Sequence, residues 1–152
     1  MAMTQRLPPD FREFLRLLNN FRVRYLLIGG FAVGIYGYVR TTKDMDIWVS
    51  DDERNQLALR KVLNNFGFPL TSLPDSLFST PGQVLRMGVP PTRIEVLSSI
   101  SGVEFDKCYN KRKKERIDNI LVSIIDFESL LANKRASGRP QDLADVDKLI
   151  LK

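Results

Sequence analysis

The order of apolar and polar residues along the chain predicts alternating helices and strands. Apolar residues recur at helical spacing from Asp10 to Phe21, the run Tyr25–Ile28 is typical of a short buried strand, and strict alternation predicts another strand at Asp44–Val49. The other expected elements are a helix over Phe31–Tyr38, a polar connection at residues 40–43, a helix opened by Asp51-Asp52-Glu53, strands over Val84–Val89, Arg93–Ser98 and Ile120–Ile125, a helix from Asp126 to Ser137, and a last helix from Pro140 with Leu143, Val146, Leu149 and Ile150 inward. This order predicts one mixed α/β (α+β) domain over residues 1–152, with helices packed against a small mixed β-sheet.

Composition narrows the class of protein. The 152 residues are 43% hydrophobic and 27% charged, which is ordinary for a single globular domain. One cysteine, Cys108, permits no intrachain disulfide and favours a reducing, cytoplasmic setting. The absence of histidine excludes Ser-His-Asp and Cys-His catalysis. The uncharged residues 25–39 are fewer than the about 20 apolar residues that a bilayer span needs, so no membrane association is expected.

The positive charge is concentrated in one segment. The net charge is +5, and residues 107–116 (KCYNKRKKER) contain six basic residues and one acidic residue. The segment 104–116 is expected to be helical or irregular. Two interpretations stay open: a solvated surface, or contact with a polyanionic acceptor such as RNA, or with a protein acceptor, through Lys111, Arg112, Lys113 and Lys114.

Carboxylates are the candidate chemical groups. Asp44 and Asp46 occupy positions i and i+2 of one strand, so they share a face with Cα atoms about 6.6 Å apart. Glu95 has a matching position on a later strand. Burying such carboxylates without a partner is unfavourable, and a divalent cation, Mg²⁺ or Mn²⁺, is the partner that oxygen ligands suit. The alternative is a solvated strand edge. Trp48, on the same face, is expected to pack under a helix, with base stacking as the alternative.

A pair of glycines precedes this strand. Gly29-Gly30 lies between an apolar strand and a short helix, where backbone N–H groups can approach a phosphate closely. The alternative is a tight turn between strand and helix.

These segments resemble a known family. Residues 25–49 (YLLIGGFAVGIYGYVRTTKDMDIWV) are similar to the core motif of the nucleotidyltransferase superfamily, which has the fold of DNA polymerase beta-like enzymes. The spelling from Arg40 to Asp46 is close to the R-x-T-x-D-x-D form of small bacterial and archaeal members, which include the toxins of abortive-infection systems. Residues 134–145 (KRASGRPQDLAD) resemble a second signature of that branch, K-x-x-x-x-R-x-x-D-x-x-D.

The resemblance implies a reaction and a set of roles. The reaction is metal-dependent transfer of a nucleoside monophosphate from a nucleoside triphosphate to a hydroxyl of RNA, protein or a small molecule, and a toxin-type enzyme is one form of it. The implied metal ligands are Asp44, Asp46 and Glu95, the implied catalytic residues are these three and Lys134, and the implied nucleotide-binding residues are Gly29, Gly30, Thr42, Lys43 and Arg139.

Alternatives remain at this stage. The chain could be a catalytically inactive member of the same fold that binds nucleotide, nucleic acid or a partner protein, or an RNA-binding module that acts through residues 107–116. Asp142 and Asp145 could be acidic residues of a first helical turn, and Lys134 and Arg139 ordinary surface charges. Because Lys134 lies near a helix C-terminus, we expect its loss to cost only about 0.3–1 kcal/mol, so that Lys134→Ala leaves the fold intact.

Overall fold

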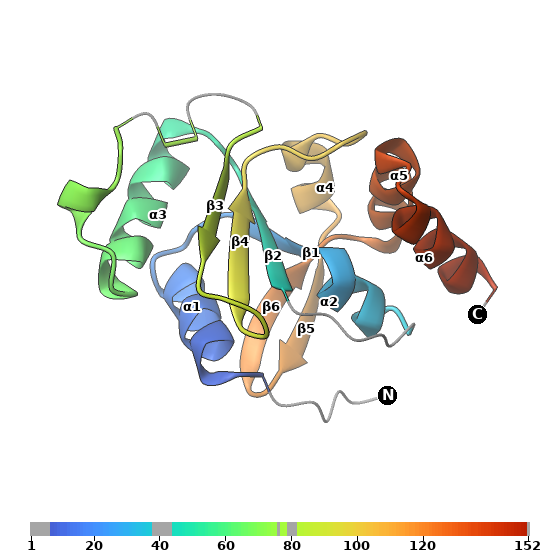
Figure 1. The fold of residues 1–152 in the computed structure, drawn as a ribbon, viewed down its shortest axis with the longest axis horizontal. Coiled ribbons are helices and arrows are strands. Elements are labelled where there is room, and N and C mark those ends of the chain that lie inside the picture. Colours follow the sequence, from blue (N-terminus) through green and yellow to red (C-terminus); the bar gives the residue numbers. More distant parts are fainter. Residues whose placement is uncertain (1–6, 38–43, 76, 79–81, 152) are drawn as a thin grey trace.

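The computed structural model describes residues 7–37, 44–75, 77–78 and 82–151 (Figure 1). The elements among these residues are α1 (Pro9–Asn20), β1 (Tyr25–Ile28), α2 (Gly29–Ile35), β2 (Asp44–Val49), α3 (Glu53–Asn65), a 3-10 turn (Leu70–Ser72), β3 (Val84–Met87), β4 (Arg93–Leu97), α4 (Phe105–Asn110), β5 (Lys113–Ile117), β6 (Ile120–Ile124), α5 (Phe127–Ser137) and α6 (Pro140–Ile150). None of these helices is long and apolar enough to cross a bilayer. The predicted mixed α/β architecture is confirmed.

The strands form one mixed sheet in the order β3-β4-β2-β1-β6-β5. β1 is antiparallel to β2 and parallel to β6, and β2 is parallel to β4. The edge strands β3 and β5 are antiparallel to their neighbours. The central strand β1 is buried along its whole length, which explains its uninterrupted apolar sequence.

Helices cover both faces of the sheet. In Figure 1, α1 and α3 lie together on one side, and α4, α5 and α6 lie on the other. Phe14 of α1 and Phe66, at the end of α3, meet edge to face with ring centroids 5.1 Å apart. Trp48 of β2 is buried against Phe105 of α4 at the same centroid distance. Trp48 therefore packs under a helix, as predicted.

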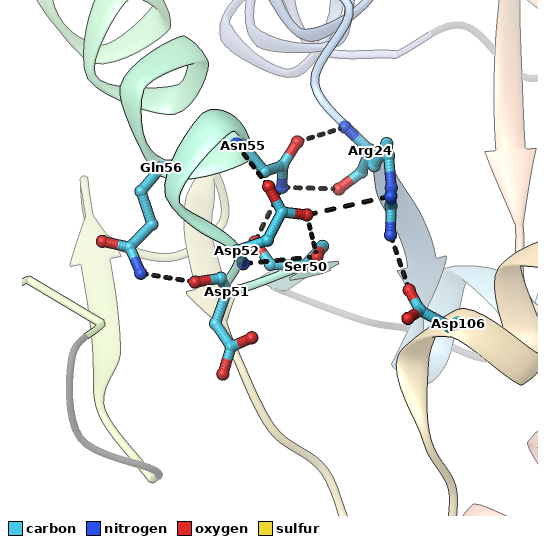
Figure 2. A network of polar contacts seen from close by, with 7 residues as sticks. All are labelled: Arg24, Ser50, Asp51, Asp52, Asn55, Gln56 and Asp106. Carbon is cyan, nitrogen blue, oxygen red and sulfur yellow. Dashed lines mark hydrogen bonds and ion pairs between the residues drawn. The ribbon is translucent and has the colours of Figure 1, made fainter.

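A polar network joins β1 and β2 to α3 and α4 (Figure 2). The side chain of Asp52, the N-cap residue of α3, accepts a hydrogen bond from the backbone N–H of Asn55. The buried Asn55 amide accepts from the backbone N–H of Arg24 at 2.6 Å and donates to the backbone carbonyl of Ser50 at 2.7 Å. The Arg24 guanidinium reaches Asp106 of α4. This network fixes the end of β1 at Tyr25 and the end of β2 at Val49, which are the strand ends farther from Ile28 and Asp46.

Two expected elements differ from the structure. The segment 104–116, expected to be helical or irregular, contains α4 and also the edge strand β5. Four of the five β5 residues are charged and only Ile117 is buried, so the strand lacks the apolar alternation by which strands are recognised. The helix expected from Phe31 begins two residues earlier, at Gly29.

The orientation expected for α6 is half wrong. Val146 and Leu149 are buried as predicted, but Leu143 and Ile150 are 46% and 53% exposed. Their place inside is taken by Asp142 and Asp145, which are 2% and 0% exposed. The helix is therefore turned so that two carboxylates face α5, because α5 offers them a buried cation.

Candidate active site

Strand pairing brings the three predicted carboxylates together. β2 and β4 run side by side with Asp46 opposite Glu95, and Asp44 lies two residues before Asp46 on the same face. One carboxylate oxygen from each of the three residues lies within 4.8 Å of the other two. All three residues are partly buried at the same place on the sheet.

Burial and crowding disfavour the charge on Asp46. Desolvation, with further repulsion from Glu95 and Asp44, raises the pKa of Asp46 from 3.8 to about 6. The positive charges of Lys134 and Arg139 act in the opposite direction. The pKa of Asp46 is therefore raised in spite of the basic side chains near it.

Two arginines, which the sequence analysis did not single out as site residues, lie against the same carboxylates. Arg93 donates from Nε and Nη2 to the two oxygens of Asp44, each at 3.0 Å. Its Nε also lies 3.5 Å from Glu95 Oε1, and Arg86 of β3 places its own Nε 3.4 Å from that oxygen. Alternation in β4 puts Arg93 on the face of Glu95, but the pairing with Asp44 depends on the order of the strands.

Gly29 is required by the close approach of Asp46. Its φ of +69° lies in the left-handed region that favours glycine. A Cβ at this position would clash with Asp46 Oδ2. The absent side chain of Gly29 thus allows the carboxylate to lie directly beside the start of α2. Gly30 is buried in the first turn of that helix.

The C-terminal signature reaches the same place. A hollow of about 380 Å³ lies beside the carboxylates and is lined by Gly29, Asp46, Glu95, Lys134 and Arg139, together with Ile28, Leu97, Ser99, Ile100, Ser101, Asn133, Ser137 and Asp142. The fold therefore brings residues of both sequence motifs into one pocket, although about 90 residues separate them in the chain. Ser99, Ser101 and Asn133 carry no recognisable sequence signal.

Lys134 is the centre of a buried ionic network. Its Nζ donates to Asp142 Oδ1 at 3.3 Å and to Asp145 Oδ2 at 3.0 Å. Asp142 also accepts from Arg139 Nε and Ser137 Oγ, each at 2.7 Å, and Asp145 accepts from Gln141 Nε2 at 2.9 Å.

This network changes the interpretation of three residues. Asp142 and Asp145 are not solvated first-turn acids, and Lys134 is not a surface charge. The small contribution of Lys134 to stability was expected from an exposed position, and Lys134 is buried; we now expect a larger loss, because removing one partner of a buried ionic group is strongly destabilising.

The remaining predicted residues fall into two groups. Thr42 and Lys43 fall outside the described residues, as do Arg40 and Tyr38. The segment 111–114 contributes to two different hollows. Lys111 lines one beside α4 and α5, and Arg112 and Lys114 line another of about 350 Å³ together with Arg22. The Arg112 guanidinium lies 3.9 Å above the Tyr109 ring.

The donor set of Asp44, Asp46 and Glu95 suits a hard divalent cation. Carboxylate oxygens are the ligands that Mg²⁺ and Mn²⁺ prefer, and Mg²⁺ is usually held by one or two carboxylates plus substrate phosphates. The proximity of the three oxygens and the raised pKa of Asp46 both fit a site that a cation would stabilise.

The fold is similar to solved nucleotidyltransferases. The lincomycin-bound lincosamide antibiotic adenylyltransferase LnuA superposes with a TM-score of 0.56 at 15% sequence identity, over 95% of this chain and 96% of that chain. An antigenic nucleotidyltransferase-like protein from Paracoccidioides brasiliensis gives 0.55 at 15% identity, over 93% of this chain and 75% of that one. Comparisons with protein-family profiles and with curated protein sequences give no match. The predicted nucleotidyltransferase-like fold is thereby confirmed.

Proposed function

We propose that this protein transfers a nucleoside monophosphate from a nucleoside triphosphate to a hydroxyl acceptor, with Mg²⁺ or Mn²⁺ as cofactor. The observation that carries the proposal is the convergence of Asp44, Asp46 and Glu95 beside a hollow that Lys134 and Arg139 also line. The reaction needs carboxylates that hold a metal ion and basic side chains that neutralise the phosphate chain. The fold shared with nucleotidyltransferases supports the same conclusion.

The reaction is a substitution at the α-phosphorus. The acceptor oxygen forms a bond to that phosphorus, the bond from phosphorus to the bridging oxygen of pyrophosphate breaks, and the hydroxyl proton passes to a carboxylate, for which we propose Glu95. A bound divalent cation would neutralise phosphate charge and hold the reacting oxygens. Asp44 and Asp46 would hold that cation with Glu95.

Lys134 and Arg139, the basic residues of the hollow, would stabilise the negative charge that develops on the leaving pyrophosphate. A lysine ammonium has three N–H donors, and among the described residues two of those of Lys134 are used by Asp142 and Asp145. The third is available for a phosphate oxygen in the hollow. Arg139, whose side chain is 75% exposed, is placed for the same purpose. Such contacts strengthen as pyrophosphate leaves, so they favour the transition state.

Gly29 and Gly30 are proposed to lie against the triphosphate. Gly29 lines the hollow, and because the space of its missing side chain holds the Asp46 carboxylate, a triphosphate would meet the Gly29 backbone beside the metal ligands. Nucleotide binding by Thr42 and Lys43 stays a prediction from the sequence.

A small-molecule hydroxyl is the acceptor that we favour. The hollow is of the size of a small-ligand site. LnuA, whose chain is matched over almost its whole length, is an adenylyltransferase of lincosamide antibiotics, so one domain of this size is sufficient for a small acceptor.

A polynucleotide acceptor is the second candidate, and a separate observation favours it. The hollow of about 350 Å³ beside β5 is lined by Arg22, Arg112 and Lys114, and none of the described residues that line it is acidic. If RNA binds there, Arg22→Gln with Lys114→Gln should lower the slope of log affinity against log salt by about 0.7 for each phosphate that is no longer neutralised. Lys61→Gln, on the exposed face of α3, is the matched control.

The test has a binding step and a transfer step. Thermal unfolding is measured with Mn²⁺ and each nucleoside triphosphate, and a ligand at 100 times its dissociation constant should add about 2.7 kcal/mol. Transfer from each α-labelled triphosphate is then measured to a panel of small hydroxyl compounds, total RNA and protein. Asp46→Asn should abolish transfer, whereas Asp51→Asn, an exposed carboxylate at the start of α3, should not.

The outcomes separate the proposed functions. Binding and labelling of a small molecule would support the proposal, and labelling of RNA alone would support the second acceptor and agree with a toxin-type enzyme. Nucleotide binding without transfer to any acceptor would favour the catalytically inactive binding protein. No metal-dependent stabilisation by any of the four nucleotides would overturn the proposal.

A further inference from the structure

Arg93 is bound to one of the proposed metal ligands by a two-pronged ion pair. Its Nε and Nη2 donate to Oδ1 and Oδ2 of Asp44, so both oxygens of that carboxylate accept from one guanidinium. The pairing is built into the sheet, because Asp44 and Arg93 are directly opposite in the register of β2 and β4. The same Nε lies 3.5 Å from Glu95 Oε1, so the guanidinium spans two of the three carboxylates.

This contact conflicts with binding of a metal ion by the same carboxylates. Mg²⁺ requires ligand oxygens at about 2.0–2.1 Å in near-octahedral geometry, and a cation that close to Asp44 would lie within a few ångströms of the guanidinium. Two positive charges at that separation repel each other, so the guanidinium and a metal ion compete for the negative charge of Asp44, although each oxygen has a second lone pair. Arg86 differs, because its one ion pair among the described residues is with Glu95, through a single nitrogen, and its side chain is 60% exposed.

We infer that Arg93 is an internal counter-cation that holds Asp44 and Glu95 in the metal-free protein and is displaced from Asp44 by charge repulsion when a divalent cation binds. This inference rests on the proposed function, because it concerns the cation of the same site. Arg93 therefore weakens binding of the metal alone.

The Arg93 side chain has room to move away from Asp44. The Arg93 side chain is 33% exposed, so it can turn outward without breaking the core. A triphosphate that arrives with the metal would offer it phosphate oxygens, to which arginine binds with the same fork of donors. Arg93 would in this way make metal binding stronger when the nucleotide is present.

The experiment measures binding of Mn²⁺ to the full chain by electron paramagnetic resonance, without and with a nucleoside triphosphate analogue that has a methylene group between the α and β phosphorus atoms. Arg93→Gln should bind Mn²⁺ alone about three- to fivefold more tightly than the unmodified protein, which is the change expected when a partly exposed, two-pronged ion pair need not be broken. The matched control Arg86→Gln also removes one positive charge beside Glu95 and should change the affinity less than about twofold.

Two further variants secure the interpretation. Arg93→Lys keeps the positive charge but lacks the pair of N–H donors that binds both oxygens of Asp44. Its affinity for Mn²⁺ should lie between those of Arg93→Gln and the unmodified protein. Asp46→Asn should remove Mn²⁺ binding in every background. The increase in Mn²⁺ affinity caused by the analogue should be larger in the unmodified protein than in Arg93→Gln. Circular dichroism confirms that each variant is folded.

The results distinguish failure of the inference from failure of the proposed function. Mn²⁺ bound equally or less tightly by a folded Arg93→Gln overturns the inference and leaves the metal-dependent function standing. An equal gain in Arg86→Gln also overturns it, since general charge would then explain the effect. No Mn²⁺ binding by any variant overturns both. Binding by Arg93→Gln where the unmodified protein binds none without the analogue is the strongest support.

Discussion

Replacement of Lys134 by methionine removes the cation of the buried network while keeping most of the side chain's volume. Asp142 and Asp145, which are almost fully inaccessible to solvent, would then face each other without the ammonium between them. Breaking a buried ion pair from one side costs about 3–5 kcal/mol. Asp142 keeps Arg139 and Ser137, and Asp145 keeps Gln141, so we expect about 3 kcal/mol, at the lower end of that range.

The loss can be measured by urea unfolding. Trp48 is the single tryptophan and is buried, so its fluorescence reports global unfolding. A loss of about 3 kcal/mol corresponds to a decrease in Tm of about 6–12 °C for a domain of this size. Arg135→Met is the control, because Arg135 is an exposed neighbour on the same helix, and it should cost less than about 0.5 kcal/mol.

A second substitution tests the mechanism of the loss. In the Lys134→Met background, Asp145→Asn removes one of the two carboxylate charges that Lys134 neutralises in the unmodified protein and should recover part of the stability. A loss below about 1 kcal/mol for Lys134→Met, or a further loss in the double variant, would refute the argument from buried charge. A catalytic role of Lys134 must therefore be assayed under conditions in which the variant is shown to be folded.

Three further perturbations test other parts of the site. Gly29→Ala should destabilise the protein and weaken Mn²⁺ binding, because the new Cβ would clash with Asp46. Gly34→Ala, in the same helix, has open space for a Cβ and should have neither effect. Equal losses of stability in thermal unfolding would contradict the role given to Gly29. Asp46→Asn should stabilise the metal-free protein slightly, since burial and then Glu95 raise the pKa of Asp46, and should abolish the gain in Tm with Mn²⁺; a retained gain would place the metal elsewhere. Although burial raises the pKa of Asp142, hydrogen bonds from Arg139 and Ser137 lower it from 3.8 to about 2 overall. About 1–2 kcal/mol of the free energy of unfolding should therefore be lost as the pH falls from about 4 to 2. The stability of Asp142→Asn should not show this pH-dependent loss over the same range.

The sequence was sufficient to predict the class of fold and the central carboxylates. Alternation alone places Asp44 and Asp46 on one face, whereas the close approach of Asp46 to Gly29 is visible only in the structure. The ion pair of Arg93 with Asp44 was beyond prediction, because it depends on β4 pairing with β2 in one register, which periodicity does not specify.

The C-terminal helix shows a different limit. Pattern analysis assigns apolar residues to the core and charged residues to solvent, and this assignment fails for Leu143 and Asp145 of α6. The buried position of Asp145 depends on a lysine in another helix, so no property of the α6 sequence itself could reveal it. The resemblance to the C-terminal signature singled out Lys134, Asp142 and Asp145, but it did not indicate that these three residues form an ionic network in the interior.

The charge of the edge strand β5 affects how the protein behaves toward copies of itself. β5 lies at one edge of the sheet, where unpaired backbone groups are a template for association with another strand. Antiparallel pairing of two such edges centred on Glu115 would place Lys114 opposite Arg116, and parallel pairing would place each lysine opposite its own copy; like charges directly opposite are destabilising in both cases. The basic segment thus protects the sheet from edge-to-edge aggregation, a benefit that it provides whether or not any polyanion binds to it.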